Sequence, residues 1–205
     1  MNYFVTAIGT DSGKTVISAA LAQALNADYW KPIQAGFPTD SDLVKKLTNE
    51  TIKIHQEKYI LKTPASPHLA AEIDQISISL DDFILPITNN DLIIEGAGGC
   101  LVPINSKDSV IDLVTRFDAE VIVISNNYLG SINHTLLTLE YLKSINMSPK
   151  AIIFNDEPNE STEDIILKRT NIPCLIKVSK LDSVDQNTIK KLGESIKERW
   201  NELGW

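Results

Sequence analysis

The sequence predicts an α/β fold in which one domain, residues 1–205, builds a parallel sheet with helices on both faces. Apolar runs of strand length alternate with helical segments along the chain, and strands joined in this way pair in parallel and are covered on both sides. The chain is 43% hydrophobic, enough for one sizeable core. No repeat, low-complexity tract or linker divides it.

The first predicted element is an apolar strand over residues 3–8, which leads into a glycine-bearing loop, the first turn of a helix by Thr15 and the continuation of that helix over residues 16–25. The loop reads Gly-Thr-Asp-Ser-Gly-Lys-Thr from Gly9 to Thr15. A strand, such a loop and a helix N-terminus turn several N–H groups toward one small volume, which favours an anion. The strict P-loop spacing has glycine where this chain has Ile8, but the surrounding strand and helix support the motif. The sequence thus predicts a P-loop NTPase-like domain in which Lys14 contacts phosphates and Thr15 ligates Mg²⁺.

A second strand is predicted over residues 27–33, with Lys31 near its carboxyl end. The ligand crevice of an open α/β sheet lies outside these strand ends, so Lys31 is expected beside the phosphate loop, with a solvated lysine as the alternative. A turn-rich loop follows, and a helix is predicted over residues 42–47. Asp40 or Ser41 is the expected cap of that helix, and Asp42 is a candidate metal ligand.

Ser66 and Pro67 predict another helix start, because serine favours the N-cap and proline the first helical position. His68 in the same stretch is expected to be a surface or hydrogen-bonded structural histidine. Capping chemistry by itself indicates no binding role for this segment.

An apolar strand over residues 91–95 ends in Glu95, and Gly96, Gly98 and Gly99 follow. A carboxylate at the end of a buried strand is costly unless it is paired or bound to a cation, so Glu95 is predicted to be a metal ligand or a catalytic group. The glycines allow the backbone to approach a ligand closely.

The remaining chain continues the alternation of strands and helices. Strands are predicted over residues 120–125, 151–155 and 174–178, and helices over residues 131–146, 162–170 and from Gln186 onward. The last helix has an apolar stripe and an opposite face of mixed charge, which is typical of a helix packed on a sheet rather than of a lipid anchor. The stripe consists of Ile189, Leu192, Ile196, Trp200 and Leu203.

Charge and cysteine content argue against several classes of protein. The net charge of −8 and the pI near 4.9 argue against a nonspecific nucleic-acid surface. Cys100 and Cys174 lie far apart without metal-ligand spacing and are expected to be reduced thiols. With no basic N-terminal region and no apolar run near about 20 residues, neither a signal peptide nor a membrane span is expected, and the protein is expected in the cytoplasm.

Seven motifs in one order make the chain resemble the dethiobiotin synthetases, which act in the penultimate step of biotin synthesis. The resemblance covers residues 3 to about 155 and is jointly specific, although one motif alone would be weak. The motifs are Phe-Val-Thr with Gly-Thr-Asp-Ser-Gly-Lys-Thr, Tyr-Trp-Lys-Pro-Ile-Gln-Ala-Gly, Asp-Ser-Asp, Pro-Ala-Ser-Pro-His-Leu-Ala-Ala, Ile-Glu-Gly-Ala-Gly-Gly, Leu-Gly-Ser-Ile-Asn-His and Phe-Asn-Asp.

The resemblance implies an enzyme that joins CO₂, ATP and 7,8-diaminopelargonic acid. One amino group forms a carbamate, ATP phosphorylates the carbamate, and the second amine closes the cyclic urea, so that dethiobiotin, ADP and phosphate result. The resemblance also implies ATP and Mg²⁺ as cofactors and a homodimer with shared active sites. Neither nucleic acid nor a membrane is an expected partner.

The resemblance also implies roles for individual residues. Lys14 and Lys31 match the active-site lysines, which would neutralise charge on the phosphoryl group and the carbamate. The magnesium ligands would be Thr15, Asp42 and Glu95. The nucleotide would contact Gly9, Thr10, Asp11, Ser12, Gly13, Lys14, Thr15, Glu95, Gly98 and Asn155, with Asn155 reading adenine. The substrate would contact Thr10, Asp11, Ala35 and Ser66, and across the dimer interface a helix start at Gly130, Ser131, Ile132 and Asn133, whose N–H groups suit a carboxylate.

Some positions depart from the family pattern. Ala7 stands where many members have glycine, and Asp11 where some have glutamate. Ala35 replaces a substrate-contacting serine of some members, which leaves one substrate hydrogen bond unassigned. The chain after Asn155 matches weakly, so the remaining adenine and ribose contacts are unassigned.

Two other classes are alternatives. A partitioning or septum-site ATPase of the related P-loop group usually carries an additional lysine early in the loop, and residues 7–12 contain none. A small-molecule kinase would also need the P-loop and Mg²⁺, but it does not explain the helix-start anion site at Gly130.

Overall fold

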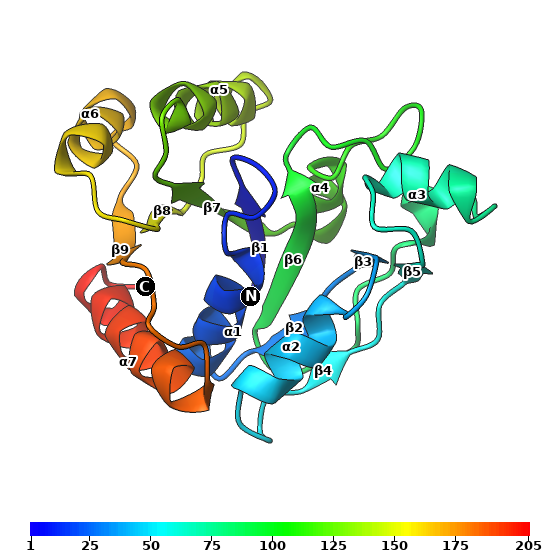
Figure 1. The fold of residues 1–205 in the computed structure, drawn as a ribbon, viewed down its shortest axis with the longest axis horizontal. Helices are drawn as coiled ribbons and strands as arrows, with labels where there is room; N and C mark the ends of the chain where they lie inside the picture. The colour runs from blue at the N-terminus through cyan, green and yellow to red at the C-terminus, as the bar shows by residue number, and fades with distance from the viewer.

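The computed structural model describes residues 1–205, which build a seven-stranded parallel sheet in the order β4-β2-β6-β1-β7-β8-β9 (Figure 1). The two short strands β3 (Ile33–Ala35) and β5 (Tyr59–Leu61) pair with each other in a separate parallel sheet. The predicted parallel α/β architecture is therefore confirmed. The main sheet consists of β1 (Asn2–Ala7), β2 (Asp28–Trp30), β4 (Ile54–His55), β6 (Leu92–Gly99), β7 (Glu120–Asn126), β8 (Ala151–Asn155) and β9 (Cys174–Val178).

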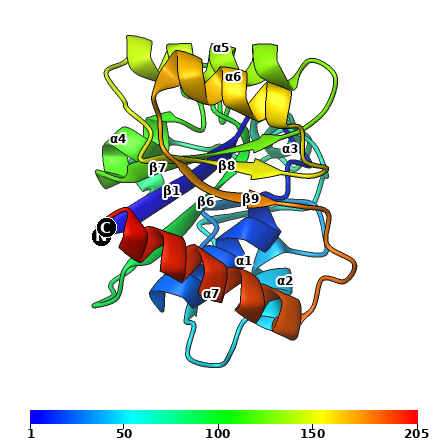
Figure 2. The same cartoon turned by 90° about the vertical axis from the view of Figure 1, so that its left-hand side faces the viewer.

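Helices cover both faces of the main sheet. Figure 2 shows α5 and α6 on one side and α1 and α7 on the other. The helices are α1 (Lys14–Leu25), α2 (Asp40–Leu47), α3 (Pro67–Ile73), α4 (Asp112–Phe117), α5 (Ser131–Ser144), α6 (Glu160–Thr170) and α7 (Gln186–Glu202), with a short 3₁₀ helix, η1, at Leu80–Asp82.

Each face of the sheet has its own hydrophobic core. Along β1, Tyr3 and Val5 belong to the core beneath α1 and α7, whereas Phe4 belongs to the opposite core, as the two-residue period of a strand requires. Trp200 of α7 packs edge-on against Tyr3 with ring centroids 5.2 Å apart. The apolar stripe of the last helix thus packs inward as predicted, and no helix is long and apolar enough to cross a membrane.

The position of β1 in the sheet places the phosphate loop. β1 lies between β6 and β7, so the chain builds one half of the sheet on the β6 side of β1 and the other half on its β7 side. Ligand crevices of open α/β sheets form at such switch points, outside the carboxyl ends of the strands. Residues 8–13 leave β1 at this position and lead directly into α1.

The strand predicted over residues 27–33 is wrong in its extent. β2 ends at Trp30, and the chain leaves the main sheet before it forms β3. Pro32 lies at the break, where it has no N–H group to continue the ladder, and its carbonyl instead accepts the N–H groups of Lys58 and Tyr59. The break turns the chain at Lys31 and sends β3 along the edge of the crevice.

The strand predicted to end at Glu95 continues to Gly99. Val5 pairs with Glu95 and Ala7 pairs with Gly99, so Glu95 lies within the strand. A Cβ atom at Gly96 would approach the Phe4 ring to 2.9 Å, so the glycine lets β6 pass over this core residue. Glu95 therefore projects from the paired, interior part of the strand rather than from its end.

Several helix boundaries also differ from the predictions. α6 begins at Glu160, earlier than predicted, and α5 ends at Ser144, before the predicted residue 146, whereas α1 has its first turn at Lys14 and Thr15 as predicted. α2 begins at Asp40 because Thr39, and neither of the predicted residues, caps it: its Oγ1 accepts the Asp42 N–H at 3.0 Å. The short elements β4, β5, η1 and α4 were not predicted, since they are too short for a clear periodicity.

Candidate functional site

A cavity of about 840 Å³ lies at the carboxyl ends of the central strands. One wall is the phosphate loop and the first turn of α1, and the opposite wall comes from β3, the start of α2 and residues 64–67. Lys31 and Glu95 line the space between them. Residues far apart in the sequence, which were predicted separately to bind ligands, thus share one cavity.

The phosphate loop leaves the N-terminus of α1 open to a ligand. Gly13 occupies the N-cap position with φ of +82°, and no side chain caps the helix. The loop folds on itself through Ser12 Oγ, which donates to the Gly9 carbonyl at 3.2 Å. Free N–H groups at a helix start and the helix dipole both favour a phosphate at this position.

Lys14 lies folded back along this loop, where its Nζ donates to the Gly9 carbonyl at 3.0 Å. Burial of the side chain, followed by repulsion from Lys31, lowers the pKa of Lys14 to about 8. Two ammonium groups in one cavity repel each other, and an anion placed between them relieves that repulsion. The pair of lysines therefore favours a multiply charged ligand.

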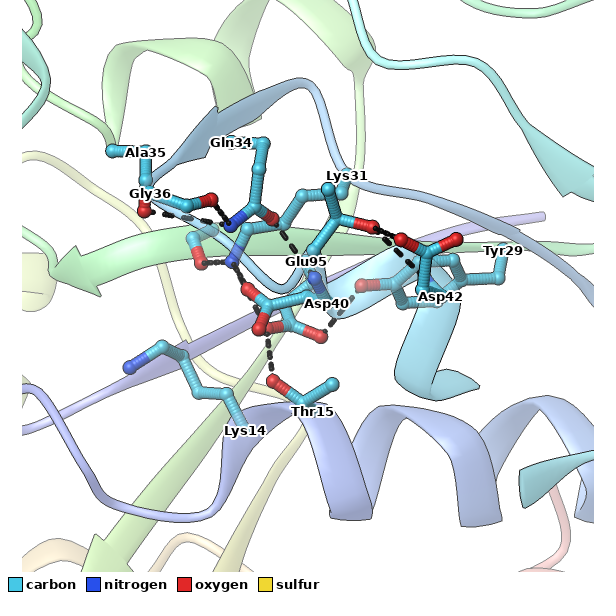
Figure 3. Close-up of polar contacts among 12 residues, drawn as sticks. Lys14, Thr15, Tyr29, Lys31, Gln34, Ala35, Gly36, Asp40, Asp42 and Glu95 are labelled. Carbon is cyan, nitrogen blue, oxygen red and sulfur yellow. Dashed lines mark hydrogen bonds and ion pairs between the residues drawn. The ribbon is translucent and has the colours of Figure 1, made fainter. Parts of the chain in front are cut away.

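Glu95 is the centre of a buried hydrogen-bond network (Figure 3). Its Oε1 accepts Thr15 Oγ1 at 2.9 Å and Lys31 Nζ at 3.0 Å, and its Oε2 accepts the Tyr29 hydroxyl at 2.9 Å. The residue is only 1% exposed, so these partners compensate the cost of burying its charge. Burial and the Glu95 carboxylate raise the pKa of Tyr29 far above its usual value, which keeps this hydroxyl a hydrogen-bond donor.

Lys31 is surrounded by three oxygen atoms. Besides Glu95, its Nζ contacts the Gly96 carbonyl at 3.1 Å and Asp40 Oδ2 at 2.7 Å. Burial lowers the pKa of Lys31, but the two carboxylates outweigh burial and raise it above its usual value. The ammonium therefore stays charged and is held in one position.

The acidic residue of α2 that enters the site is Asp40. Its carboxylate faces Lys31, and its backbone N–H donates a hydrogen bond to Gln34 Oε1 at 3.0 Å. Asp42, which was predicted to be a metal ligand, is exposed, does not line the cavity and accepts Thr39 Oγ1 at 2.7 Å as part of the helix cap. Residues two positions apart point in different directions from a helix, so the sequence motif alone does not tell which acid faces the cavity.

The donor set at this position fits Mg²⁺. Glu95 and Asp40 turn carboxylate oxygens toward Lys31, and the Thr15 hydroxyl lies against Glu95. Oxygen is the donor that this hard cation prefers. No group of three or more His, Cys, Asp or Glu side chains forms a cage of its own. A magnesium ion held here would take its remaining oxygens from phosphate groups and water.

Asn155 lies at the end of β8 and reaches the phosphate loop. Its Nδ2 donates to the Ser12 carbonyl at 3.0 Å. A Cβ atom at Gly13 would lie 2.4 Å from that nitrogen, so only glycine leaves room for this contact. The structure thus places Asn155 beside the loop, with the side-chain Oδ1 left for another donor.

The predicted substrate residues fall into two groups. Thr10, Asp11, Ala35 and Ser66, together with Gly98, line the cavity. Ser66 occupies the predicted N-cap position of α3, but its hydroxyl makes no capping bond and contacts His68 Nδ1 at 3.1 Å.

The second group, at the start of α5, does not line this cavity within one chain. Gly130 is the N-cap with φ of +108° and has open space beside it, Ile132 and Asn133 are exposed, and Ser131 is buried with no partner for its Oγ. The neighbouring Leu129 is fully exposed. This helix start faces outward from the molecule.

Three residues of the site were missed from the sequence: Tyr29, Gln34 and Asp40. Tyr29 and Gln34 flank Lys31 in the same motif, and Asp40 belongs to the acidic pair before α2. Their closeness to Lys31 in the sequence was a signal that they belong to the site. The direction in which each side chain points, however, depends on the break at Pro32 and on the Thr39 cap.

Comparison with known proteins gives consistent matches over nearly the whole chain. A family model described as an AAA domain matches residues 1–188. The ATP-dependent dethiobiotin synthetase BioD of Cytophaga hutchinsonii is 51% identical over 203 residues, which cover 98% of each chain. The protein of the same name from Christiangramia forsetii is 44% identical over 205 residues, covering 98% of this chain and 99% of the relative.

Solved structures of similar fold include a ParA family ATPase from Chlorobium tepidum, with a TM-score of 0.55 and 16% identity, covering 99% of this chain and 91% of that one. A putative plasmid partition protein from Borrelia burgdorferi has a TM-score of 0.59 and 13% identity, with 98% of both chains covered. At these identities the likeness shows the fold alone. The predicted P-loop NTPase-like fold is confirmed.

Proposed function

This chain belongs to the ATP-dependent dethiobiotin synthetase family, and from that membership we propose how its cavity carries out the reaction. The enzyme forms dethiobiotin with ATP in biotin biosynthesis. In the chemistry we propose, an amine of 7,8-diaminopelargonic acid adds to CO₂ to give a carbamate, which takes the γ-phosphoryl group of ATP. The second amine then attacks the carbonyl carbon, the C–O bond to phosphate breaks, and the cyclic urea forms.

The observation that carries this proposal is the pair of buried lysines beside the phosphate loop. Carbamate and γ-phosphate are both anions, and the transfer step concentrates negative charge between them. Lys14 on the loop and Lys31 opposite it supply fixed positive charge at these two places. Because Lys31 is already oriented by three oxygen partners, little reorganisation is required during the reaction.

We propose that Mg²⁺ binds through Thr15, Glu95 and an acid from the first turn of α2. The family resemblance assigns this third position to Asp42, whereas the geometry supports Asp40, which faces Lys31 at 2.7 Å. When bound, the ion supplies charge neutralisation at the nucleotide phosphates. The residues of this chain hold the phosphates against the α1 N-terminus and keep the lysines in place.

The nucleotide base is proposed to lie at the end of β8. Asn155 Nδ2 donates to the Ser12 carbonyl, so Oδ1 remains available to accept the adenine amino group. Gly9 to Thr15, together with Gly98 and Glu95, would enclose the phosphates. In this arrangement the residue that recognises the base is hydrogen-bonded to the loop that binds the phosphates.

The substrate chain is proposed to run from this cavity to a neighbouring subunit. Thr10, Asp11, Ala35 and Ser66 surround the end where the amines react. At the exposed start of α5, the Ser131 N–H donates to the Tyr128 carbonyl at 3.0 Å, but the N–H groups of Gly130, Ile132 and Asn133 have no backbone acceptor, which suits the substrate carboxylate of a second chain. A homodimer with two shared sites follows from this proposal.

Incubation with ATP, Mg²⁺, the diamine and ¹⁴C-bicarbonate tests the function. We expect labelled dethiobiotin and equimolar ADP and phosphate, with no product when the diamine is left out. ATP hydrolysis that does not depend on the diamine would instead indicate a switch ATPase. A phosphorylated small molecule without incorporated label would indicate a kinase.

A further inference from the structure

A buried carboxylate outside the reaction cavity contacts two loops and a neighbouring strand at the same edge of the sheet. Glu163 of α6 is 1% exposed. Its Oε1 accepts Asn127 Nδ2 at 2.8 Å and the Asn159 backbone N–H at 2.9 Å, and its Oε2 lies 2.7 Å from Lys177 Nζ. These partners come from the segments that follow β7 and β8 and from β9.

Two of these segments lead to proposed ligand sites. Asn127 lies in the turn between β7 and the start of α5, shortly before Gly130. Asn159 caps α6 and closes the loop that begins at Asn155. Glu163 is therefore bonded both to the segment that carries the carboxylate site and to the segment that carries the base site.

The connection continues to the phosphate loop. The Asn127 N–H donates to the Asn155 carbonyl at 2.9 Å, and Asn155 Nδ2 donates to the Ser12 carbonyl at 3.0 Å. Asn127 Nδ2 also donates to the Glu157 carbonyl at 3.0 Å. One continuous set of hydrogen bonds thus runs from Glu163 through Asn127 and Asn155 to the loop that holds the phosphates.

The charge on Glu163 is stabilised at this buried position. Burial raises its pKa, but the Lys177 ammonium and the donors from Asn159 and Asn127 outweigh burial and hold the pKa below its usual range. The hydrogen bond to Glu163 raises the pKa of Lys177. At neutral pH both partners are charged, so the carboxylate accepts bonds from both loops and donates to neither.

We infer that Glu163 is a positioning residue for the reaction, which acts through Asn127 and Asn159 to hold the base-binding and carboxylate-binding loops in register. The inference rests on the proposed roles of Asn155 and of the α5 N-terminus. Both loops follow the ends of neighbouring strands, and Asn127 bonds directly to Asn155 and Glu157 across them. Glu163 adds an acceptor that both loops share, which restricts their relative movement further. Such restriction matters because a small misplacement of bound substrates lowers the reaction rate strongly.

The other half of the sheet provides a matched control. Asp28 is also 1% exposed, and its carboxylate contacts His55 Nε2 at 2.8 Å and Asn90 Nδ2 at 2.9 Å. None of these three residues lines the reaction cavity. Loss of the Asp28 charge therefore perturbs a buried carboxylate cluster without altering the loops after β7 and β8.

The test compares Asn127→Ala, Glu163→Gln and Asp28→Asn with the wild type. For each we would measure thermal stability, the KM for ATP and diamine, kcat, and amide hydrogen exchange of residues 127–131 and 155–159. We expect Asn127→Ala and Glu163→Gln to raise the diamine KM roughly tenfold or more and to speed exchange in both loops. Glu163→Gln should also raise the ATP KM, whereas Asp28→Asn should change only stability.

The inference is overturned if both cluster variants lose stability as Asp28→Asn does but keep both KM values and the wild-type exchange. Should Glu163→Gln fail to fold, Asn127→Ala decides alone, because it leaves the Glu163–Lys177 pair intact. A wild-type enzyme that binds ATP but forms no dethiobiotin would overturn the proposed function instead. In that case the loop exchange and the nucleotide affinity of the variants still decide the positioning role.

Discussion

Lys31 shows how its surroundings can fix the charge and the position of a single buried residue. A lysine ammonium has three donors, and here Glu95, Asp40 and the Gly96 carbonyl accept them. Neighbouring carboxylates compensate the burial of the charge and also fix its position. Lys14, by contrast, has a pKa of about 8, so a bound phosphate is expected to raise its pKa and strengthen its charge.

Replacement of either lysine should abolish turnover. We expect Lys14→Ala and Lys31→Ala to reduce kcat by about 10²–10³ or more, because each removes a cation from the transferring group. Steady-state rates on purified, folded protein check this, with circular dichroism as the control. Lys31→Arg should not restore the rate, since a guanidinium cannot reproduce the compact three-oxygen contact of an ammonium. Near-normal turnover in either alanine variant would contradict the assigned roles.

The two acids of α2 can be separated by substitution. Asp40→Asn should raise the Mg²⁺ concentration needed for half-maximal activity at least about tenfold, because Asp40 faces the cavity and Lys31. Asp42→Asn should instead lower the melting temperature slightly, through a weaker Thr39 cap. Glu95→Gln serves as the reference for a lost ligand. Measuring activity against Mg²⁺ concentration tells which acid binds the metal. A larger rise in the Mg²⁺ requirement for Asp42→Asn than for Asp40→Asn would assign the metal role to Asp42.

At the scale of elements, the site depends on how β6 and α1 are supported. Glu95 lies within β6, and glycines follow it in the same strand. The N-terminus of α1 lies just after the end of β1. α1 packs against α7, and Gly193 of α7 lies at this contact: a Cβ atom there would lie 3.0 Å from Gln23 Cβ and 3.2 Å from the Ala20 carbonyl. Close packing of these two helices therefore contributes to the stability of the fold that carries the phosphate loop.

Gly193→Leu should destabilise the protein without changing its chemistry. A large side chain at this contact forces α7 away from α1, at a cost of about 1–3 kcal/mol in the free energy of unfolding. Urea denaturation measures that cost, and kcat at a temperature where the variant is folded should stay close to wild type. The exposed α7 substitution Glu194→Leu is the control and should have little effect on stability. An unchanged denaturation midpoint for Gly193→Leu would show that the helices tolerate a wider separation.

At the scale of the whole molecule, the cavity and the proposed carboxylate site lie on different surfaces of one chain. The cavity contains the phosphate loop, Lys31 and Glu95, whereas the helix start at Gly130 lies outside it. Exposed apolar side chains at Tyr128, Leu129 and Ile132 surround that helix start. This distribution suits an assembly in which each active site takes residues from two chains.

A mixed-dimer experiment tests the shared site. Gly130→Val should raise the diamine KM, because a β-branched residue is strained at φ of +108° and obstructs the N–H groups, while ATP affinity stays near normal. A mixture of Lys14→Ala and Gly130→Val chains should regain activity, since each heterodimer contains one intact loop facing one intact helix start. If heterodimers confirmed by native mass spectrometry are no more active than either parent, each chain works alone.

Much of the architecture followed from local patterns. β8, β9 and the start of α7 lie where periodicity predicted them, and strand, Gly-Lys-Thr and helix identified the phosphate loop. The errors arose where a local pattern competes with a contact from elsewhere. Pro32 interrupted the strand predicted over residues 27–33, and the glycines after Glu95 resembled a strand end although pairing with β1 extends β6 through them.

The sequence by itself determined which chemical groups we propose for the reaction: an anion-binding loop, two lysines, a glutamate on a strand and an exposed helix start. Only the tertiary structure decided how they meet. Glu95 reaches Thr15, Tyr29 and Lys31 across separations of 64 to 80 residues, and Asp40 rather than Asp42 faces the cavity because Thr39 sets where α2 begins. The reason is that hydrogen bonding depends on direction and on a few ångströms of distance, which strand order, register and helix caps establish together and no single segment encodes.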